Sequence, residues 1–179
     1  MIHYSVTAFE LETMKAVSLK GYSDLFITDF EIPAKDFCFS LVWNTYGISS
    51  YDSKTGTLIK TSDATDVSKY TTTYKMNDIE LMTVYNLLMQ LKDYPDNYDP
   101  YNDPDSETHI MSTPNRTVII KFTANGEEKT IRCENICYGL NGGYDDAANK
   151  FLAIERRIED ILTDTKQWQT LPEYEHFYD

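Results

Sequence analysis

The first half of the chain shows the alternation of apolar and polar side chains that is typical of β-strands. The clearest case places an apolar side chain at every second position: Phe37, Phe39, Leu41 and Trp43. This predicts a strand over 37–44 with one well-buried face. Turn-forming residues at 51–56 precede 57–60, which suits the return strand of a hairpin, and a Thr-rich and Tyr-rich strand is expected near 71–75. Residues 5–32 favour one or two further strands.

Two segments change to the three-to-four spacing of a helix. Asn77 with Glu80 three residues later is a capping-box pattern, which predicts a helix over about 78–91. Its apolar positions are Leu81, Val84, Tyr85, Leu88 and Leu91. A second helix, capped by Asp145 or Asp146, is expected to run to about residue 163. Its expected apolar stripe is Ala147, Phe151, Ile154, Ile158 and Ile161, with Glu155, Arg156, Glu159 and Asp160 on the other faces.

Turn-forming and loop-forming residues mark the connections in the rest of the chain. Residues 93–109 contain three prolines and no aliphatic side chain before Ile110, which predicts a long loop. The segments 116–122 and 127–133 flank an Asn-Gly pair at 125–126, which supplies the positive φ angles of a tight hairpin turn. The aromatic tail over 168–178 is expected to dock on the domain.

Strands grouped in hairpins with two main helices predict the fold class. We expect an α+β fold with a largely antiparallel sheet, on which helices over about 78–91 and 146–163 pack. Neither an internal repeat nor a linker argues for a second domain. The sequence therefore predicts a single domain over 1–179, with the weakest pattern in 1–36.

Composition adds a strongly acidic charge to this picture. The chain has 179 residues, with 16 Lys and Arg against 29 Asp and Glu, giving a formal net charge of -13. Such a charge disfavours direct binding to nucleic acid and to anionic membranes. No apolar run approaches the roughly 20 residues that span a bilayer, and the first residues do not resemble a signal peptide. We therefore expect a cytoplasmic protein, or a cell-surface one if a leader has been removed.

The negative charge is concentrated in the predicted loop. From Asp93 to Glu107 there are six acids and no Lys or Arg. Tyrosines alternate with the acids, a composition that suits binding to a protein or glycan partner. The candidate partner-binding residues are Tyr94, Asp96, Tyr98, Asp99, Tyr101 and Asp103. In the alternative, the rings fold back over the sheet edge while the acids keep the loop soluble. The acids lack EF-hand spacing, which leaves only adventitious calcium binding.

The sequence contains no recognisable catalytic or cofactor motif. A Gly-x-Ser-x-Gly elbow and a P-loop lysine are both missing, so we expect no catalytic residue and no cofactor. The three histidines lie apart from one another and from the cysteines, which argues against a metal site: His3, His109 and His176. Cys38, Cys133 and Cys137 are odd in number; reduced thiols are the simpler interpretation, and one disulfide remains open.

Several segments together resemble a family of small uncharacterised bacterial domains. The segments are DFCFSLVWNTYG, SYDSKTGTLIK, NDIELMTVYNLLMQL leading into YPDNYDP, VIIKFTANGEEKTI and LPEY, in that order over residues 37–174. Family members are largely Gram-positive, and many are cell-surface lipoproteins. The resemblance implies a compact α+β domain without an established activity, so it carries no catalytic residue over. This chain departs from the lipoprotein members because it has neither a leader nor a lipid-acceptor cysteine near its start.

Three functional hypotheses follow. The first is a non-enzymatic bacterial domain that binds a protein or glycan through the loop. The second is an acidic inhibitor that imitates nucleic acid and blocks a DNA-binding or RNA-binding enzyme, which requires carboxylates in rows on one face. The third is an enzyme with an unrecognised site, which requires a cleft holding a carboxylate, Cys or His of strongly perturbed pKa. The sequence leaves the partner and the oligomeric state open.

Overall fold

The computed structural model describes residues 4–9, 16–21, 31–102, 110–137, 140 and 142–178. Its main element is a six-stranded antiparallel sheet with strand order β6-β5-β4-β3-β7-β8. The strands are β3 (Cys38–Trp43), β4 (Ser49–Asp52), β5 (Thr57–Ile59), β6 (Thr71–Thr73), β7 (Arg116–Ala124) and β8 (Glu127–Ile136). The first two strands, β1 (Tyr4–Phe9) and β2 (Ala16–Gly21), form a separate antiparallel pair.

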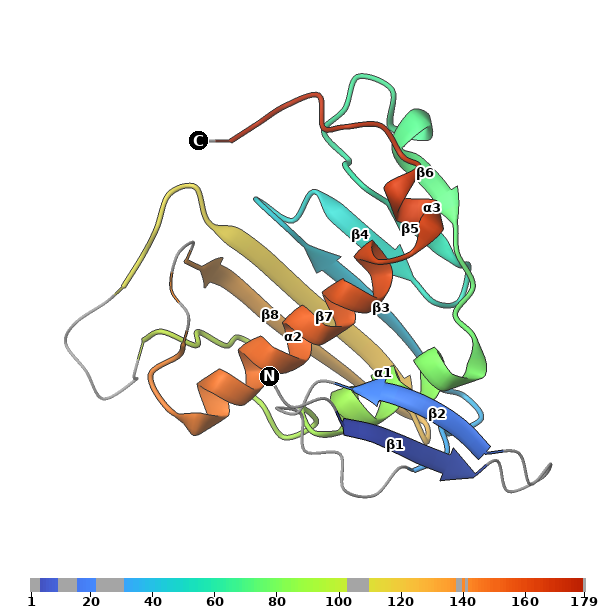
Figure 1. The fold of residues 1–179 in the computed structure, drawn as a ribbon. Coiled ribbons are helices and arrows are strands. Elements are labelled where there is room, and N and C mark those ends of the chain that lie inside the picture. The colour runs from blue at the N-terminus through green and yellow to red at the C-terminus, as the bar shows by residue number, and fades with distance from the viewer. Residues whose placement is uncertain are drawn as a thin grey trace.

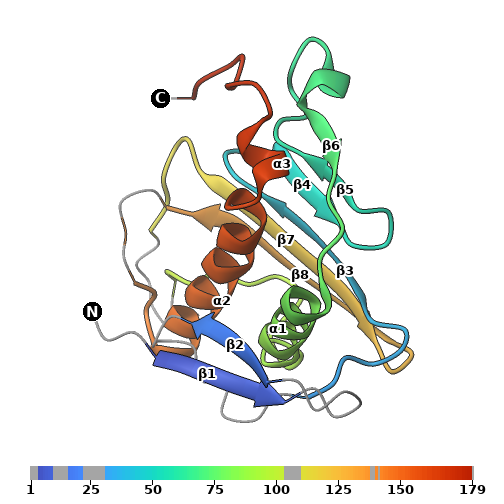
Figure 2. The same cartoon turned by 45° about the vertical axis from the view of Figure 1, so that its right-hand side comes forward.

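Two helices lie on one face of this sheet, α1 (Asp78–Met89) and α2 (Asp146–Thr163) (Figures 1 and 2). Two shorter helices are the 3-10 helix η1 (Val67–Tyr70) and the α-helix α3 (Lys166–Gln169). The α+β prediction is therefore confirmed. In the described part of the chain, no helix combines the length and apolar character that crossing a membrane requires.

The core lies between the sheet and the two helices. In β3 the side chains Phe39, Leu41 and Trp43 are buried while those between them are half-exposed, as the alternation predicts. On β7, Phe122 is the register partner of Phe39 and Ile120 that of Leu41, so both strands present apolar side chains to the helices. The hairpin turn between β7 and β8 has φ of 54° at Asn125 and 79° at Gly126, which confirms the Asn-Gly prediction.

The helix starts follow the predicted caps. Asn77 Oδ1 accepts from the backbone N–H groups of Ile79 and Glu80, and Glu80 Oε2 accepts from Asn77 N, which completes the capping box. Asp145 caps α2 by accepting from Ala148 N at 2.7 Å. The first helix ends at Met89, two residues before the predicted end, because the Leu91 N–H turns to the Leu88 carbonyl.

The buried stripe of α2 shares Phe151, Ile154 and Ile158 with the prediction and differs from it elsewhere: Leu152 and Leu162 are also buried, and Ile161 is half-buried. Ala148 is buried and Ala147 is exposed. Glu155 was expected on another face, and this is wrong: its exposed fraction is 1%. It comes four residues after Phe151 and three before Ile158, so helical geometry places all three on one face. The sheet supplies the partner that this buried carboxylate needs.

The C-terminal tail docks on the sheet, as its aromatic content predicts. The Trp168 ring stacks on Trp43 with centroids 5.4 Å apart. Asn44 Nδ2 donates to the Tyr174 hydroxyl at 2.9 Å. The Lys60 ammonium lies over the rings of both Trp168 and Tyr174, at 5.8 and 5.2 Å from their centroids. These contacts hold the chain that follows α2 against the end of the sheet.

Candidate functional site

The predicted loop begins by running along the outer edge of β8. Arg132 N donates to the Asp96 carbonyl at 2.7 Å, and Tyr98 N donates to the Arg132 carbonyl at 2.9 Å. These two bonds form a parallel bridge between Asn97 and Arg132. An ion pair of 2.8 Å between Lys129 Nζ and Asp96 adds to the attachment. The start of the loop is therefore fixed to the sheet by its own backbone.

The loop tyrosines turn inward. The Tyr98 ring meets Tyr94 and Phe151 edge-on, with centroids 5.1 and 4.9 Å away. The Tyr94 hydroxyl donates to the Ala147 carbonyl at 2.8 Å, and Tyr101 is only 5% exposed. Burial raises the pKa of all three phenols. The rings therefore cover the core beside α2, as in the alternative in which they fold back, and their replacement would remove core packing.

The loop carboxylates have separate surroundings. Asp96 is exposed and pairs with Lys129. Asp99 accepts from Tyr101 N with one oxygen and from the side-chain amides of Asn102 and Asn135 with the other. Asp103 lies outside the described residues. Asp99 thus ties the loop to the end of β8, while Asp96 remains on the surface.

These attachments leave a groove of about 460 Å³, which we call the loop groove. Its lining comes from the loop, the segment before β7 and the end of β8: Asn97, Tyr98, Asp99; Met111, Ser112, Asn115; Arg132, Glu134, Asn135. Two of the six predicted partner-binding residues, Tyr98 and Asp99, belong to it. The volume lies within the range of small-molecule sites, roughly 300–1,000 Å³. The groove is the place where the predicted loop residues meet other polar groups.

Internal hydrogen bonds hold the groove in shape. Asn135 Nδ2 donates to the carbonyl of Ile110 at 2.7 Å, as does Asn102 Nδ2 at 3.0 Å. The Asn115 amide donates to the Glu134 carbonyl, and Arg132 Nη1 pairs with the Glu134 carboxylate at 2.9 Å. Three segments far apart in the sequence are thereby fixed to one another. A preformed groove loses less conformational entropy when it binds a ligand.

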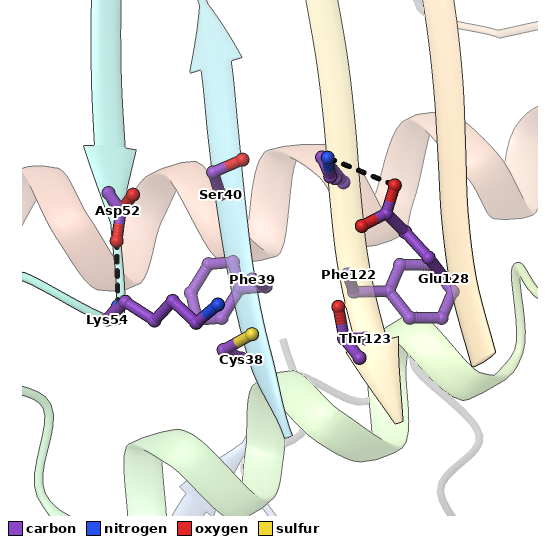
Figure 3. Close-up of a pocket in the computed structure, with 9 residues that line it drawn as sticks. Cys38, Phe39, Ser40, Asp52, Lys54, Phe122, Thr123 and Glu128 are labelled. Atoms are coloured by element: carbon purple, nitrogen blue, oxygen red, sulfur yellow. Dashed lines mark hydrogen bonds and ion pairs between the residues drawn. The ribbon is translucent and has the colours of Figure 1, made fainter. Parts of the chain in front are cut away.

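A second cavity of about 230 Å³ lies on the sheet face opposite the helices (Figure 3). Its polar lining residues come from four strands and one turn: Cys38, Ser40, Asp52, Lys54, Lys121, Thr123 and Glu128. The charges here pair locally, since Lys121 Nζ is 3.0 Å from Glu128 and Asp52 Oδ1 accepts from the backbone N–H of Lys54. Figure 3 shows the Lys54 side chain reaching toward β3, with its end near Cys38.

The three cysteines are free thiols in distinct surroundings. Cys38 is half-buried, whereas Cys133 and Cys137 are buried. Cys38 is the register partner of Thr123 and Cys133 that of Val118, so the two lie at different heights of the sheet. Burial raises the pKa of Cys133 to about 12, which suppresses its reactive thiolate.

We therefore expect one fast alkylation per native chain. N-ethylmaleimide should modify Cys38 alone in the folded protein and all three cysteines in denaturant, because thiolate character and access govern the reaction. Intact-mass spectrometry with peptide mapping measures this. Cys38→Ser is the control and should leave the native chain unmodified. Equal labelling of Cys133 under native conditions would contradict the burial described above.

A buried carboxylate lies between α2 and β7. Arg116 Nη2 is 3.1 Å from Glu155 and also pairs with Glu159, and the Arg116 side chain is 15% exposed. Burial raises the pKa of Glu155, opposed by Arg116 and reinforced by Glu159. Such a shift is one mark of an active site. Glu155 lines neither of the two cavities described above, and its contact with Arg116 is that of an ion pair between α2 and β7.

Metal-ligating side chains are scattered over the described ranges. Within them, no group of three or more His, Cys, Asp or Glu side chains is arranged to hold a metal ion. His176 is exposed in the tail, and His3 and His109 lie outside the described residues. The calcium alternative for the loop falls partly on residues 103–109, which also lie outside.

Comparison of the chain with protein-family models, curated proteins and solved structures found no match of any kind. The resemblance to a bacterial domain family therefore stays an expectation from sequence segments.

Sequence reasoning missed most of the loop groove. Asn97 lies inside the predicted loop, so its place in the groove could have been predicted. Nothing in the sequence pattern linked Met111, Asn115 or the end of β8 to that loop. One signal was present: Glu134 directly follows the strand predicted over 127–133 and is two residues from Arg132, so in the longer strand that forms the two share its outward face. Which loop lies beside that face depends on the path of residues 90–115 between α1 and β7, and sequence alone does not give that path.

Proposed function

We propose that the chain is a non-enzymatic binding module and that the loop groove is its ligand site. The observation that carries the proposal is that the loop singled out by composition forms one wall of a preformed polar groove. Both carboxylates of the lining are engaged by neighbours: Asp99 by three N–H donors and Glu134 by Arg132. Such groups serve to fix a surface better than to transfer protons. The ligand is a glycan or a protein segment.

The acidic-inhibitor hypothesis fits this surface less well. On the β7–β8 hairpin and the adjoining loop, acids alternate with basic partners: Asp96 with Lys129, Glu128 with Lys121, and Glu134 with Arg132. Mimicry of nucleic acid needs repeated negative charge along one face. Interleaved ion pairs break up such a row, which supports the binding-module proposal.

Filling the groove tests the proposal. Asn97 is exposed, so Asn97→Trp should leave the core intact while it occupies the groove. Immobilised protein is screened against a glycan array and a peptide library, and the affinity of each ligand found is measured for the parent chain and the variant. We expect a loss of at least about tenfold, which corresponds to about 1.4 kcal/mol.

Gln169→Trp, on the exposed side of α3, is the matched control and should bind as the parent does. Unchanged affinity in Asn97→Trp would remove the loop groove as the site. Failure of the parent chain to bind any member of either library would contradict the proposal that it is a binding module.

A further inference from the structure

We infer that the ligand of the loop groove is a small neutral saccharide, a mono- or disaccharide; this inference rests on the proposed function. The argument starts from the hydrogen-bonding groups that the groove still offers. The Asn97 side chain makes no hydrogen bond to the described residues, and its amide carries both donor and acceptor groups. Asn115 uses its NH₂ on the Glu134 carbonyl, so its amide oxygen remains to accept. Mixed donors and acceptors match hydroxyl groups, which both donate and accept.

The charged side chains of the groove favour a neutral ligand over a charged one. Arg132 Nη1 is 2.9 Å from the Glu134 carboxylate, so these two groups largely neutralise each other. The remaining charge, Asp99, has both oxygens occupied by N–H donors. The negative charge of Asp99 repels an anionic ligand, while the three N–H donors stabilise that charge and weaken its attraction for a cationic ligand. A neutral polar ligand meets neither obstacle.

An exposed apolar side chain in the groove suits the apolar face of a sugar ring. Met111 is 81% exposed at the groove, an unusual place for a large apolar side chain. A methionine side chain adapts to irregular surfaces, and a sugar ring presents an apolar C–H face together with a rim of hydroxyls. Met111 and the amides of Asn97 and Asn115, all in the groove lining, provide surfaces for both. A volume of about 460 Å³ limits the ligand to a small one.

The test uses three matched probes: glucose, its acidic counterpart glucuronic acid and its cationic counterpart glucosamine, together with a panel of neutral mono- and disaccharides. The chain is labelled with nitrogen-15, and the side-chain amide signals of Asn97, Asn115 and Asn135 are followed during titration. At least one neutral saccharide should shift these signals saturably. The charged counterpart of that saccharide should bind at least about fivefold more weakly.

Two variants locate the binding surface. Asn97→Ala and Met111→Ala should each weaken the best neutral saccharide about fivefold, the usual effect of losing one hydrogen bond or one apolar contact. Gln169→Ala and Ile32→Ala remove an exposed amide and an exposed apolar side chain away from the groove and should change nothing. Equal losses in the variants and the controls would overturn the inference.

A peptide-library arm separates this inference from the proposed function. If peptides shift the groove amides and no neutral saccharide does, the saccharide assignment is overturned and the groove remains a binding site. Tighter binding of the charged saccharides also overturns the assignment. If neither class shifts the groove signals, both proposals fail.

Discussion

Arg116→Leu should lower the free energy of unfolding, by about 1.4 kcal/mol more near pH 9 than near pH 5, because one pH unit above its pKa the folded parent chain holds Glu155 ionised against Arg116. The loss should shrink near pH 5, where Glu155 can stay protonated and neutral in the folded chain. Urea unfolding followed by circular dichroism at the two pH values measures both effects. The result would show that the ion pair is needed to tolerate the burial of Glu155.

Arg132→Leu is the matched control for that experiment. Arg132 also belongs to an Arg–Glu pair, but its side chain is 47% exposed and that of Glu134 is 65% exposed. Solvent screens such a pair, so the expected loss is below about 1 kcal/mol at either pH. Equal losses in the two variants, or a loss in Arg116→Leu that does not depend on pH, would refute the role assigned to Glu155.

Glu155→Gln should remove part of the pH dependence of stability. Burial raises the pKa of Glu155 to about 8, above its value in the unfolded chain. The folded state therefore binds more protons than the unfolded state between about pH 4.5 and 8, and stability falls as pH rises through that range. The slope reaches about 1.4 kcal/mol per pH unit for one proton. The glutamine variant lacks this proton and should show a flatter profile.

The comparison is best made above about pH 5. Asp36, Asp63 and Glu175 have lowered pKa values, so their contribution has the opposite sign and is lost at lower pH. Unfolding curves of the parent and Glu155→Gln across the higher range isolate the buried group. Parallel curves would mean that Glu155 is ionised throughout, contrary to the expected shift. Glu128→Gln, at a carboxylate on β8 that is 60% exposed, serves as the control.

Local signals predicted most of the fold, and long-range pairing was beyond them. The alternation at Phe39, Leu41 and Trp43, the cap at Asn77 and the Asn-Gly turn each depend on neighbours within a few residues, and each is confirmed. Glu155 shows the limit, because a charged residue in an apolar stripe is buried only if a partner arrives from elsewhere. That partner, Arg116, is 39 residues away in sequence.

The residues of the candidate site were likewise predictable only in part. Composition directed attention to the loop, and Tyr98 and Asp99 do line the groove. Composition alone did not show which side of the loop backbone faces the core. In the structure the Tyr98 ring packs against Phe151 of α2, so it turns toward the core and does not stand among the acids. Met111 and Asn115 line the groove because the chain passes beside the loop before it enters β7. Single-sequence patterns contain no information on that path.

The attachment of the loop to β8 also hinders the pairing of this edge strand with a strand from another molecule. An exposed edge strand offers its backbone N–H and carbonyl groups to a strand from another molecule, which is a common route to aggregation. Here Asp96 and Tyr98 occupy those groups at Arg132, and the net charge of -13 on each chain opposes the approach of a second copy. At the other edge β6 is only three residues long. The segment that forms the groove therefore also terminates the sheet.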